Sequence, residues 1–154
     1  MTRTRHIGEE SLEKKRYRLQ TAYLISEFLL RISSLRELSL KSNRIGDEGL
    51  IEICKALNDR HCCIEKLDLS HTGMTSDSFR KISLLRNQHL KTLILDRNNL
   101  STTWTFSPIA QIMSSSHLQS LSLKECFLLD SFGIAFSEAL RNNRTLQKFN
   151  FFDN

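Results

Sequence analysis

The sequence contains only one proline and five glycines among 154 residues, which excludes collagen-like chains and flexible proline- or glycine-rich linkers. It also lacks the run of roughly 20 apolar residues that a membrane-spanning helix needs, since the longest run, residues 22–25, is interrupted at Ser26 and Glu27. Hydrophobic residues nonetheless make up 40% of the chain and charged residues 25%. This composition predicts one soluble globular domain rather than a disordered tail.

No targeting signal is recognisable near the N-terminus. A secretory signal needs an apolar stretch soon after its basic start, whereas residues 5–18 are rich in charge. Glu9, Glu10 and Glu13 are also untypical of a mitochondrial presequence. We therefore expect a cytoplasmic, intracellular protein whose cysteines remain reduced thiols. They are Cys54, Cys62, Cys63 and Cys126.

The formal net charge is +5, and much of the excess lies in the first eighteen residues. A basic cluster can bind phosphate groups, but a mixed run of charges is more often a solvated helix face. Aromatic residues for base stacking are missing from this run until Tyr17. The sequence therefore predicts no specific nucleic-acid partner.

One pattern recurs five times along the chain. Its first copy, L-x-x-L-x-L-x-x-N-x-I, runs from Leu35 to Ile45, and later copies begin at positions 64, 90, 118 and 146, the last of them incomplete. The periods are 29, 26, 28 and 28 residues. This is the pattern of leucine-rich repeats. Each Leu-x-Leu predicts a short strand with one buried face, and the strands would stack in parallel roughly 4.8 Å apart.

Each predicted strand is followed by a position that closes the turn. Asn43, Asn98 and Asn154 occupy it in three repeats, where the side-chain amide is expected to satisfy buried backbone groups of neighbouring coils. Thr72 and Cys126 replace the asparagine in the other two repeats. We expect these two turns to be held by fewer hydrogen bonds, and Cys126 to have a structural role.

The second half of each repeat predicts a helix, because apolar residues recur there at helical spacing. In the third repeat Ser107 is the expected N-cap and Pro108 the first helical residue. A helix in every repeat and a period near 28 residues resemble the ribonuclease-inhibitor-like subtype of leucine-rich repeats, over roughly residues 24–154. The resemblance implies an α/β fold, a curved leucine-rich-repeat solenoid with a parallel sheet on its concave side and helices on its convex side.

The residues before the first repeat predict an N-terminal helical cap. We expect one long helix over about residues 9–31, whose apolar side covers the first repeat. Its apolar residues at helical spacing are Leu24, Ile25, Phe28 and Leu29, with Ile32 just after it. Solenoids need such polar-faced caps at their ends. The chain is thus expected to divide into a basic segment with its capping helix, residues 1–34, and the repeats, residues 35–154.

No catalytic motif is present, because the sequence contains neither a phosphate-binding loop, nor a nucleophile elbow, nor a His-Glu-x-x-His metal site. His61, Cys62 and Cys63 are the nearest approach to a metal or redox site. Adjacent cysteines lack the two-residue spacer of zinc knuckles, so we interpret them as residues of a helix-to-strand turn, with a metal or redox role as the alternative. We expect a protein that is not an enzyme and holds neither a cofactor nor a metal.

The solvent-facing strand positions are the expected protein-binding surface, on the concave face. They flank and separate the paired leucines, so they point away from the core. The set mixes both charges with hydroxyl groups, and a merely solvated surface is the alternative, since single apolar residues are normal on surfaces. The positions are Glu37, Ser39, Lys41, Lys66, Asp68, Ser70, Thr92, Ile94, Asp96, Ser120, Ser122, Lys124, Lys148, Asn150 and Phe152.

The C-terminal edge is a second expected protein contact. Phe149 and Phe151 take the two buried leucine positions of the fifth repeat, with Phe152 beside them and Asn154 at the last position. No helix follows, so part of this aromatic set and the edge of the last strand should be open to solvent, where an edge is a template for pairing. We expect missing repeats or another chain to cover this edge, and the start at Met1 favours another chain.

The sequence therefore predicts a non-catalytic protein–protein interaction module, a scaffold or a subunit of a larger intracellular assembly, with protein partners. Ribonuclease-inhibitor-like repeats also occur in activators of the small GTPase Ran, so a regulator of a small GTPase is the alternative. That family is longer and has an acidic tail, whereas this chain is short and basic. A fragment of an immune-receptor or inhibitor repeat array is a third interpretation, and it too would be a binding protein.

Overall fold

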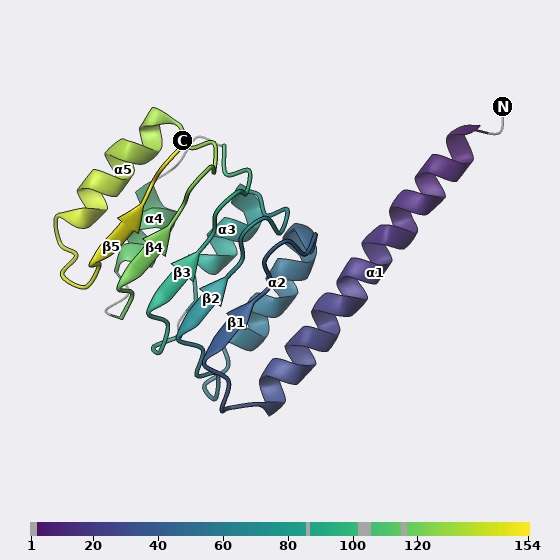
Figure 1. Cartoon of the computed structure of the whole chain (residues 1–154), viewed down its shortest axis with the longest axis horizontal. Coiled ribbons are helices and arrows are strands. Elements are labelled where there is room, and N and C mark those ends of the chain that lie inside the picture. The colour runs from purple at the N-terminus through teal and green to yellow at the C-terminus, as the bar shows by residue number, and fades with distance from the viewer. Residues whose placement is uncertain (1–2, 86, 102–105, 115–116) are drawn as a thin grey trace.

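The computed structural model describes residues 3–85, 87–101, 106–114 and 117–154. Five short strands form one parallel sheet in chain order. Figure 1 shows helices α2 to α5 together on one side of this sheet, with α1 beside α2. The strands are β1 (Glu37–Ser39), β2 (Lys66–Asp68), β3 (Thr92–Ile94), β4 (Ser120–Ser122) and β5 (Lys148–Asn150). The helices are α1 (Arg3–Arg31), α2 (Gly46–Leu57), α3 (Ser76–Ile82), α4 (Phe106–Met113) and α5 (Asp130–Leu140). The predicted α/β solenoid is confirmed.

The sheet aligns the leucine positions of the five repeats. Leu38, Leu67, Leu93, Leu121 and Phe149 pair in one row across it. The three inner leucines are buried in an apolar core to which α2 to α5 also contribute. Burying one such side chain contributes about 1.5–3 kcal/mol. The repeated leucines therefore hold the strands against the helices.

The side chain of Asn98 closes turns as predicted. Its Nδ2 atom donates to the carbonyl oxygens of Leu69 at 2.9 Å and Leu95 at 2.8 Å. Its Oδ1 atom accepts from the backbone N–H groups of Thr72 and Met74, both at 3.1 Å. Because Asn98 is buried, these bonds satisfy backbone groups that water does not reach.

The prediction of fewer hydrogen bonds in the two turns without asparagine holds only in part, because the side chains of Thr72 and Cys126 form fewer than that of Asn98 but as many as that of Asn43. Thr72 Oγ1 donates to a backbone carbonyl at 2.8 Å, and the Cys126 thiol, a weak donor, to another at 3.3 Å. The following repeat supplies what they lack. Asn98 accepts the Thr72 N–H, and Oδ1 of Asn154 accepts the Cys126 N–H at 2.8 Å.

The first residues of α3 and α4 differ in how well the sequence predicts them. Thr75 caps α3, because its Oγ1 atom accepts the Asp77 N–H at 3.3 Å. The prediction that Ser107 caps the next helix and that Pro108 is its first residue is wrong, since α4 begins at Phe106. A proline fits anywhere in the first turn of a helix, where its missing N–H would have no intrahelical acceptor.

Helix α1 begins at Arg3, earlier than the predicted residue 9, and packs against α2. Its contact face contains the buried residues Ala22, Ser26 and Leu29. Gly49 of α2 allows a close approach, because a Cβ atom built on it would lie 3.1 Å from the Cβ of Ala22. Small residues on both helices therefore determine where α1 and α2 meet.

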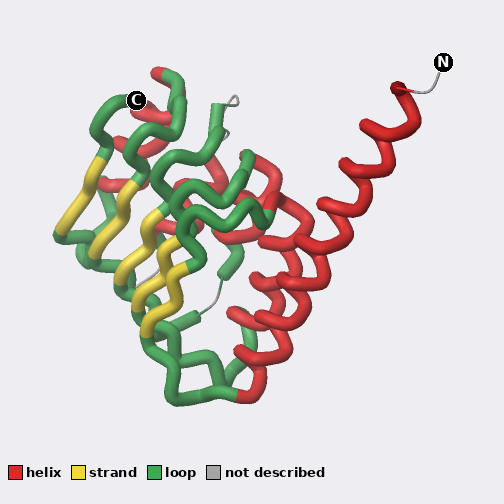
Figure 2. The backbone as a smooth tube through the Cα atoms, turned by 45° about the vertical axis from the view of Figure 1, so that its right-hand side comes forward, coloured by secondary structure: helices red, strands yellow, loops and turns green. Residues whose placement is uncertain are grey.

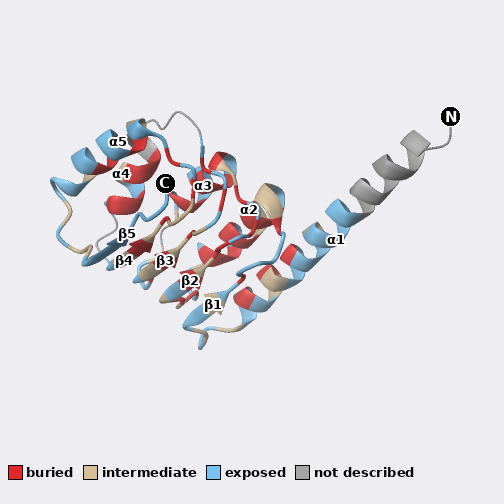
Figure 3. Ribbon diagram, turned by 45° about the horizontal axis from the view of Figure 1, so that its top comes forward, coloured by how far each residue is buried: buried red, intermediate tan, exposed pale blue. Residues whose placement is uncertain are grey.

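The outer face of α1 differs from the prediction. Leu24 and Phe28 do not cover the first repeat, since both are exposed, on the side of the helix opposite Ala22 and Ser26. Figures 2 and 3 show α1 continuing past α2 toward the N-terminus, and its role as a cap stays a prediction. Among the described residues, no helix is both long and apolar enough to cross a membrane.

Candidate protein-binding surfaces

The open face of the sheet brings the predicted concave-face residues together in three rows. Members of a row come from successive strands, which pair in parallel without a shift. The first row is Glu37, Lys66, Thr92, Ser120 and Lys148, and the second is Ser39, Asp68, Ile94, Ser122 and Asn150. The third, just after the strands, is Lys41, Ser70, Asp96, Lys124 and Phe152.

Charged groups on this face form weak, exposed contacts. Nζ of Lys66 lies 3.0 Å from Oε2 of Glu37 across the first row. Nζ of Lys124 lies 5.4 Å from the ring centroid of Phe152, a cation–π contact. Exposed ion pairs contribute only about 0–1 kcal/mol to stability. These side chains can therefore exchange partners at little cost, as a binding surface requires.

Other members of the rows hold the turns instead. The prediction that Ser70 faces solvent is wrong, because it is buried and its Oγ atom donates to Oδ1 of Asp68 at 2.6 Å. Oδ1 of Asp96 accepts from Ser122 Oγ at 2.6 Å and from the Lys124 N–H at 3.0 Å. Both carboxylates are thus engaged in positioning the backbone.

The aromatic edge, which we define as Phe149, Phe151 and Phe152, lies at the end of the array. The side chains of Phe149 and Phe151 stack on those of α5, with ring centroids 4.1 Å apart for Phe136–Phe149 and 5.6 Å apart for Phe132–Phe151. Phe149 and Phe151 remain 37% and 40% exposed, and Phe152 is 63% exposed. The equivalent leucines of the preceding repeat, at positions 121 and 123, are 1% and 0% exposed.

Strand β5 also leaves backbone groups unpaired. In the third repeat, the N–H groups of Leu95 and Arg97 donate to carbonyl oxygens of the next repeat at 2.9 and 2.8 Å. The equivalent donors of the fifth repeat are the N–H groups of Phe151 and Asp153, and the equivalent acceptor is the carbonyl of Gln147. None of these three groups forms a hydrogen bond within the part of the chain that the structure describes.

His61, Cys62 and Cys63 lie in the turn between α2 and β2. The ring Nδ1 of His61 lies 3.0 Å from Oδ1 of Asp59, and the buried Cys62 thiol accepts from Asn87 Nδ2 at 3.4 Å. Burial raises the pKa of the Cys62 thiol. Over the ranges described above, no three His, Cys, Asp or Glu side chains are grouped as metal ligands would be.

Two thiols, those of Cys54 and Cys126, are deeply buried. Burial raises the pKa of Cys54 to about 12 and that of Cys126 to about 11. The thiolate is the reactive form of cysteine, so neither side chain is suited to nucleophilic or redox chemistry at neutral pH. Cys126 instead contributes its thiol to the turn described above.

The leucine pattern gives no indication of a further regularity in the turns. The residue before the asparagine position adopts a left-handed backbone in every repeat, with φ between 53° and 62°. These residues are Ser42, His71, Arg97, Glu125 and Asp153. Since none is a glycine, only their equivalent positions in the repeat could have indicated it. One variable side chain is thereby placed at the same point of each successive turn.

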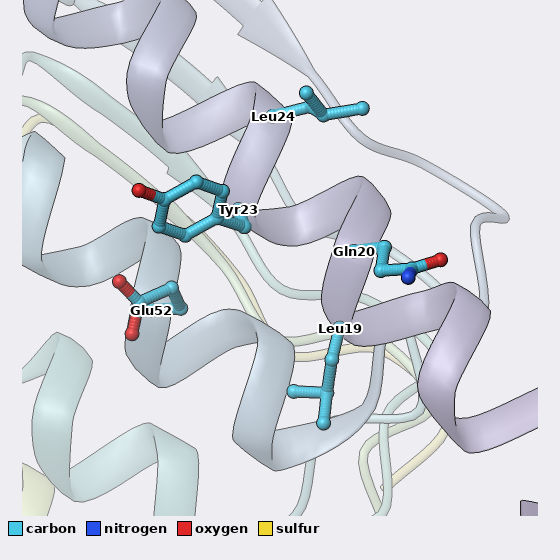
Figure 4. A pocket seen from close by; sticks show the side chains of 5 residues that line it. All are labelled: Leu19, Gln20, Tyr23, Leu24 and Glu52. Atoms are coloured by element: carbon cyan, nitrogen blue, oxygen red, sulfur yellow. The ribbon is translucent and has the colours of Figure 1, made fainter.

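A hollow along α1, bordered by Glu52 of α2, is a second feature that the sequence did not indicate. It has a volume of about 580 Å³ and is lined by Leu19, Gln20, Tyr23 and Leu24 of α1 and by Glu52 of α2 (Figure 4). In the close-up, Tyr23 points toward the side of α2 that carries Glu52, whereas Leu24 and Gln20 lie on the other side of α1. The hollow is shallow and largely apolar, and it presents one carboxylate.

Three kinds of comparison place the chain among known proteins. A family model described as Leucine Rich repeat matches residues 32–54. The bovine protein named NACHT, LRR and PYD domains-containing protein 5 is 36% identical over 126 residues, covering 79% of this chain and 11% of that protein. Mouse ribonuclease inhibitor is 34% identical over 111 residues, covering 67% of this chain and 23% of the inhibitor. The chain thus spans between about a tenth and about a quarter of the length of these relatives.

Solved structures show the same fold at lower sequence identity. The actin-binding site 2 structure of leiomodin-1 superposes with a TM-score of 0.69 at 18% identity, covering 84% of this chain and 79% of that one. The C-terminal domain of tropomodulin from Caenorhabditis elegans gives a TM-score of 0.68 at 17% identity, covering 86% and 84%. The registered repeats, the parallel sheet and the relatives together identify this chain as a leucine-rich repeat protein of the ribonuclease-inhibitor-like type.

Proposed function

We propose that this chain is a non-catalytic protein–protein interaction module, acting as a scaffold or as a subunit of a larger intracellular assembly. Leucine-rich repeat proteins generally mediate protein–protein interaction, and one of the relatives is named as an inhibitor of an enzyme. The observation that carries the proposal is the uncovered end of the solenoid, where the aromatic edge and the unpaired backbone of β5 coincide.

The aromatic edge supplies the apolar part of the contact. Large aromatic side chains that become buried dominate the binding energy of many interfaces. Phe149 and Phe151 are already fixed by stacking on α5, so their burial costs little side-chain entropy. A partner that covered them would bury apolar side chains whose equivalents in the preceding repeat are already buried.

The unpaired backbone supplies direction and register. The unpaired groups are the carbonyl of Gln147 and the N–H groups of Phe151 and Asp153. They stand at the positions where the backbone of each inner repeat bonds to the next repeat. They therefore suit a strand that pairs with β5 in parallel, as a further leucine-rich repeat would. We propose that another chain or further leucine-rich repeats supply this strand, and that the concave face binds the same or a second protein partner.

Hydrogen exchange on the isolated chain and on a crosslinked native complex tests this proposal. We expect fast exchange at Phe151 and Asp153 in the isolated chain and strong protection in the complex, with the inner amides of Leu95 and Arg97 protected in both. Strong protection of Phe151 and Asp153 in a monodisperse isolated monomer would contradict the proposal, and protection only in a longer form of the chain would assign the edge to further repeats.

The non-catalytic part of the proposal has its own test. The small GTPase Ran is incubated with GTP in the presence and absence of the purified chain. We expect no change in the rate of GTP hydrolysis. Acceleration would replace the scaffold with a GTPase regulator.

A further inference from the structure

A basic groove lies where the loops that follow the strands come close to α1. We define it by Arg18 of α1, Arg44 before α2, His71 before α3 and Arg97 before α4, and it has a volume of about 710 Å³. Among the described residues of its lining, Glu125 is the one with an acidic side chain. The groove lies outside the strand positions and the aromatic edge, so it would be a separate surface.

The basic side chains of the groove are largely without an acidic partner. Arg18, Arg44 and His71 are exposed, and none of them forms an ion pair within the described part of the chain. Arg97 differs, because its Nε atom lies 2.9 Å from Oε2 of Glu125 and its Nη2 atom 3.3 Å from Oε1. This two-point contact is the geometry in which a guanidinium group recognises a carboxylate.

The fold aligns these groups rather than scattering them. His71, Arg97 and Glu125 are three of the residues with a left-handed backbone, at equivalent positions of consecutive turns. The N–H of His71 donates to the Asp96 carbonyl at 2.8 Å, and that of Arg97 to the Lys124 carbonyl at 2.8 Å. Successive side chains are therefore anchored about one strand spacing, roughly 4.8 Å, apart along the groove.

The groove also has an apolar component. Phe127 contributes to its lining and is exposed, whereas Met74 contributes to its lining and is buried. A single exposed aromatic ring does not form the succession of stacking platforms on which single-stranded nucleic acids depend. Cations with one apolar contact suit an acidic peptide segment that carries an occasional apolar side chain.

We propose that the basic groove binds an acidic, aspartate- or glutamate-rich segment of a protein partner, and that Glu125 occupies Arg97 until a ligand carboxylate replaces it. The inference deepens the proposed function and rests on it, because it names the chemistry of a protein partner. Arg18 and Arg44 supply the attraction that is free from the start, and Arg97 supplies a site that is released by exchange.

Binding of a fluorescein-labelled peptide of ten alternating Asp and Glu residues, measured by fluorescence polarisation at low and high salt, tests the inference on the purified full chain. We expect saturable binding that weakens as salt rises. Arg18→Gln and Arg44→Gln should each weaken it about threefold to fivefold, the effect of one partly exposed ion pair. Arg80→Gln, which removes an exposed arginine of α3 outside the groove, is the matched control and should leave affinity unchanged.

Glu125→Gln gives the sharper test, because it should tighten binding about threefold by releasing Arg97. Its control is Glu65→Gln, which removes a carboxylate paired to Lys91 at 2.7 Å outside the groove and changes the net charge equally. Equal effects of the two glutamate variants, or of Arg44→Gln and Arg80→Gln, would overturn the inference in favour of a general charge effect.

A ten-residue thymidine oligonucleotide, measured in the same way, distinguishes the class of partner. Tighter binding of the oligonucleotide than of the peptide, with the same dependence on Arg18 and Arg44, would overturn the inference and assign the groove to nucleic acid. Unchanged thermal unfolding of the variants ensures that a loss of binding is not a loss of fold. Failure of this inference would leave the proposed function standing, because the test of that function reads the amides of β5 instead.

Discussion

Oδ1 of Asn98 accepts the backbone N–H of Thr72 at 3.1 Å, although the two residues are 26 positions apart in the chain. The same side chain donates through Nδ2 to a carbonyl of its own repeat, that of Leu95, and to one of the preceding repeat, that of Leu69. One buried amide thus closes the turns of two consecutive repeats. The Asn98 side chain therefore links these two repeats to each other.

Replacing Asn98 by alanine should therefore destabilise the whole array. Several buried backbone groups would lose their partner at once, and one unsatisfied buried group costs about 1–3 kcal/mol. We expect Asn98→Ala to lower the free energy of unfolding by about 2–4 kcal/mol in urea titrations. Asn43→Ala is the control, because Asn43 is exposed and donates only to carbonyls of its own turn, so its loss should cost less than about 1 kcal/mol.

Asp47 should make stability depend on pH. Burial raises the pKa of its carboxyl, but hydrogen bonds from Ser78 and Thr75 outweigh that effect and hold it below the ordinary value of 3.8. The stability that it contributes is therefore fully present above pH 3.8 and is lost as the pH falls through the lowered pKa of the folded state.

The measurement is urea unfolding between pH 7 and pH 2.5, with Asp47→Asn beside the parent chain. At pH 7 we expect the variant to be less stable by about 1–2 kcal/mol, a charged hydrogen-bond contribution reduced by solvent screening. The difference should shrink at the acid end. A constant difference across the range would show that the carboxylate charge is not what links α2 to α3.

Charge reversal on the concave face should separate binding from stability at Lys66 but not at Asp68. Within the part of the chain that the structure describes, the side chain of Lys66 forms only the exposed pair with Glu37, so Lys66→Glu should leave Tm nearly unchanged and weaken binding of a concave-face partner about threefold to tenfold. Asp68 accepts two hydrogen bonds from the buried Ser70, so Asp68→Lys should also lower Tm. Unchanged affinity in Lys66→Glu would move the partner to the helices or the ends.

Two truncations of α1 should have unequal effects. Removing residues 1–20 takes away the exposed Lys15–Glu48 pair and should cost about 1 kcal/mol or less. Removing residues 1–30 also takes away Ala22 and Leu29, uncovers the apolar face of α2 and should cause aggregation, measured by light scattering. Equal tolerance of both truncations would show that α1 is not a cap.

The parts of the fold that follow from short-range periodicity could be predicted. The strands lie where Leu-x-Leu alternates, because a period of two buries one face of a strand whatever surrounds it. The face of α1 could not be predicted, because Leu24 and Phe28 are as apolar as Leu29, and only the close approach of Ala22 and Gly49 decides between the two sides.

The same distinction applies to the candidate surfaces. The rows of the concave face could be predicted, because parallel strands in register bring equivalent positions together. Ser70 was missed because a serine at that position can face solvent or bond to Asp68, and only the turn geometry distinguishes the two. The basic groove joins Arg18 to residues more than 50 positions away, and no local pattern connects them.

Asn98 follows Thr72 by 26 residues, and Asn154 follows Cys126 by 28. The asparagine that accepts a hydrogen bond from each of these two turns therefore comes later in the chain than the turn itself. A ribosome releases this protein N-terminus first. While it is being translated, the newest of these turns stays open until the following repeat has left the exit tunnel. We therefore expect each of these two repeats to complete its fold only after the next repeat has emerged. In a nascent chain stalled just after Cys126, that turn would have only the weak hydrogen bonds of the Cys126 thiol.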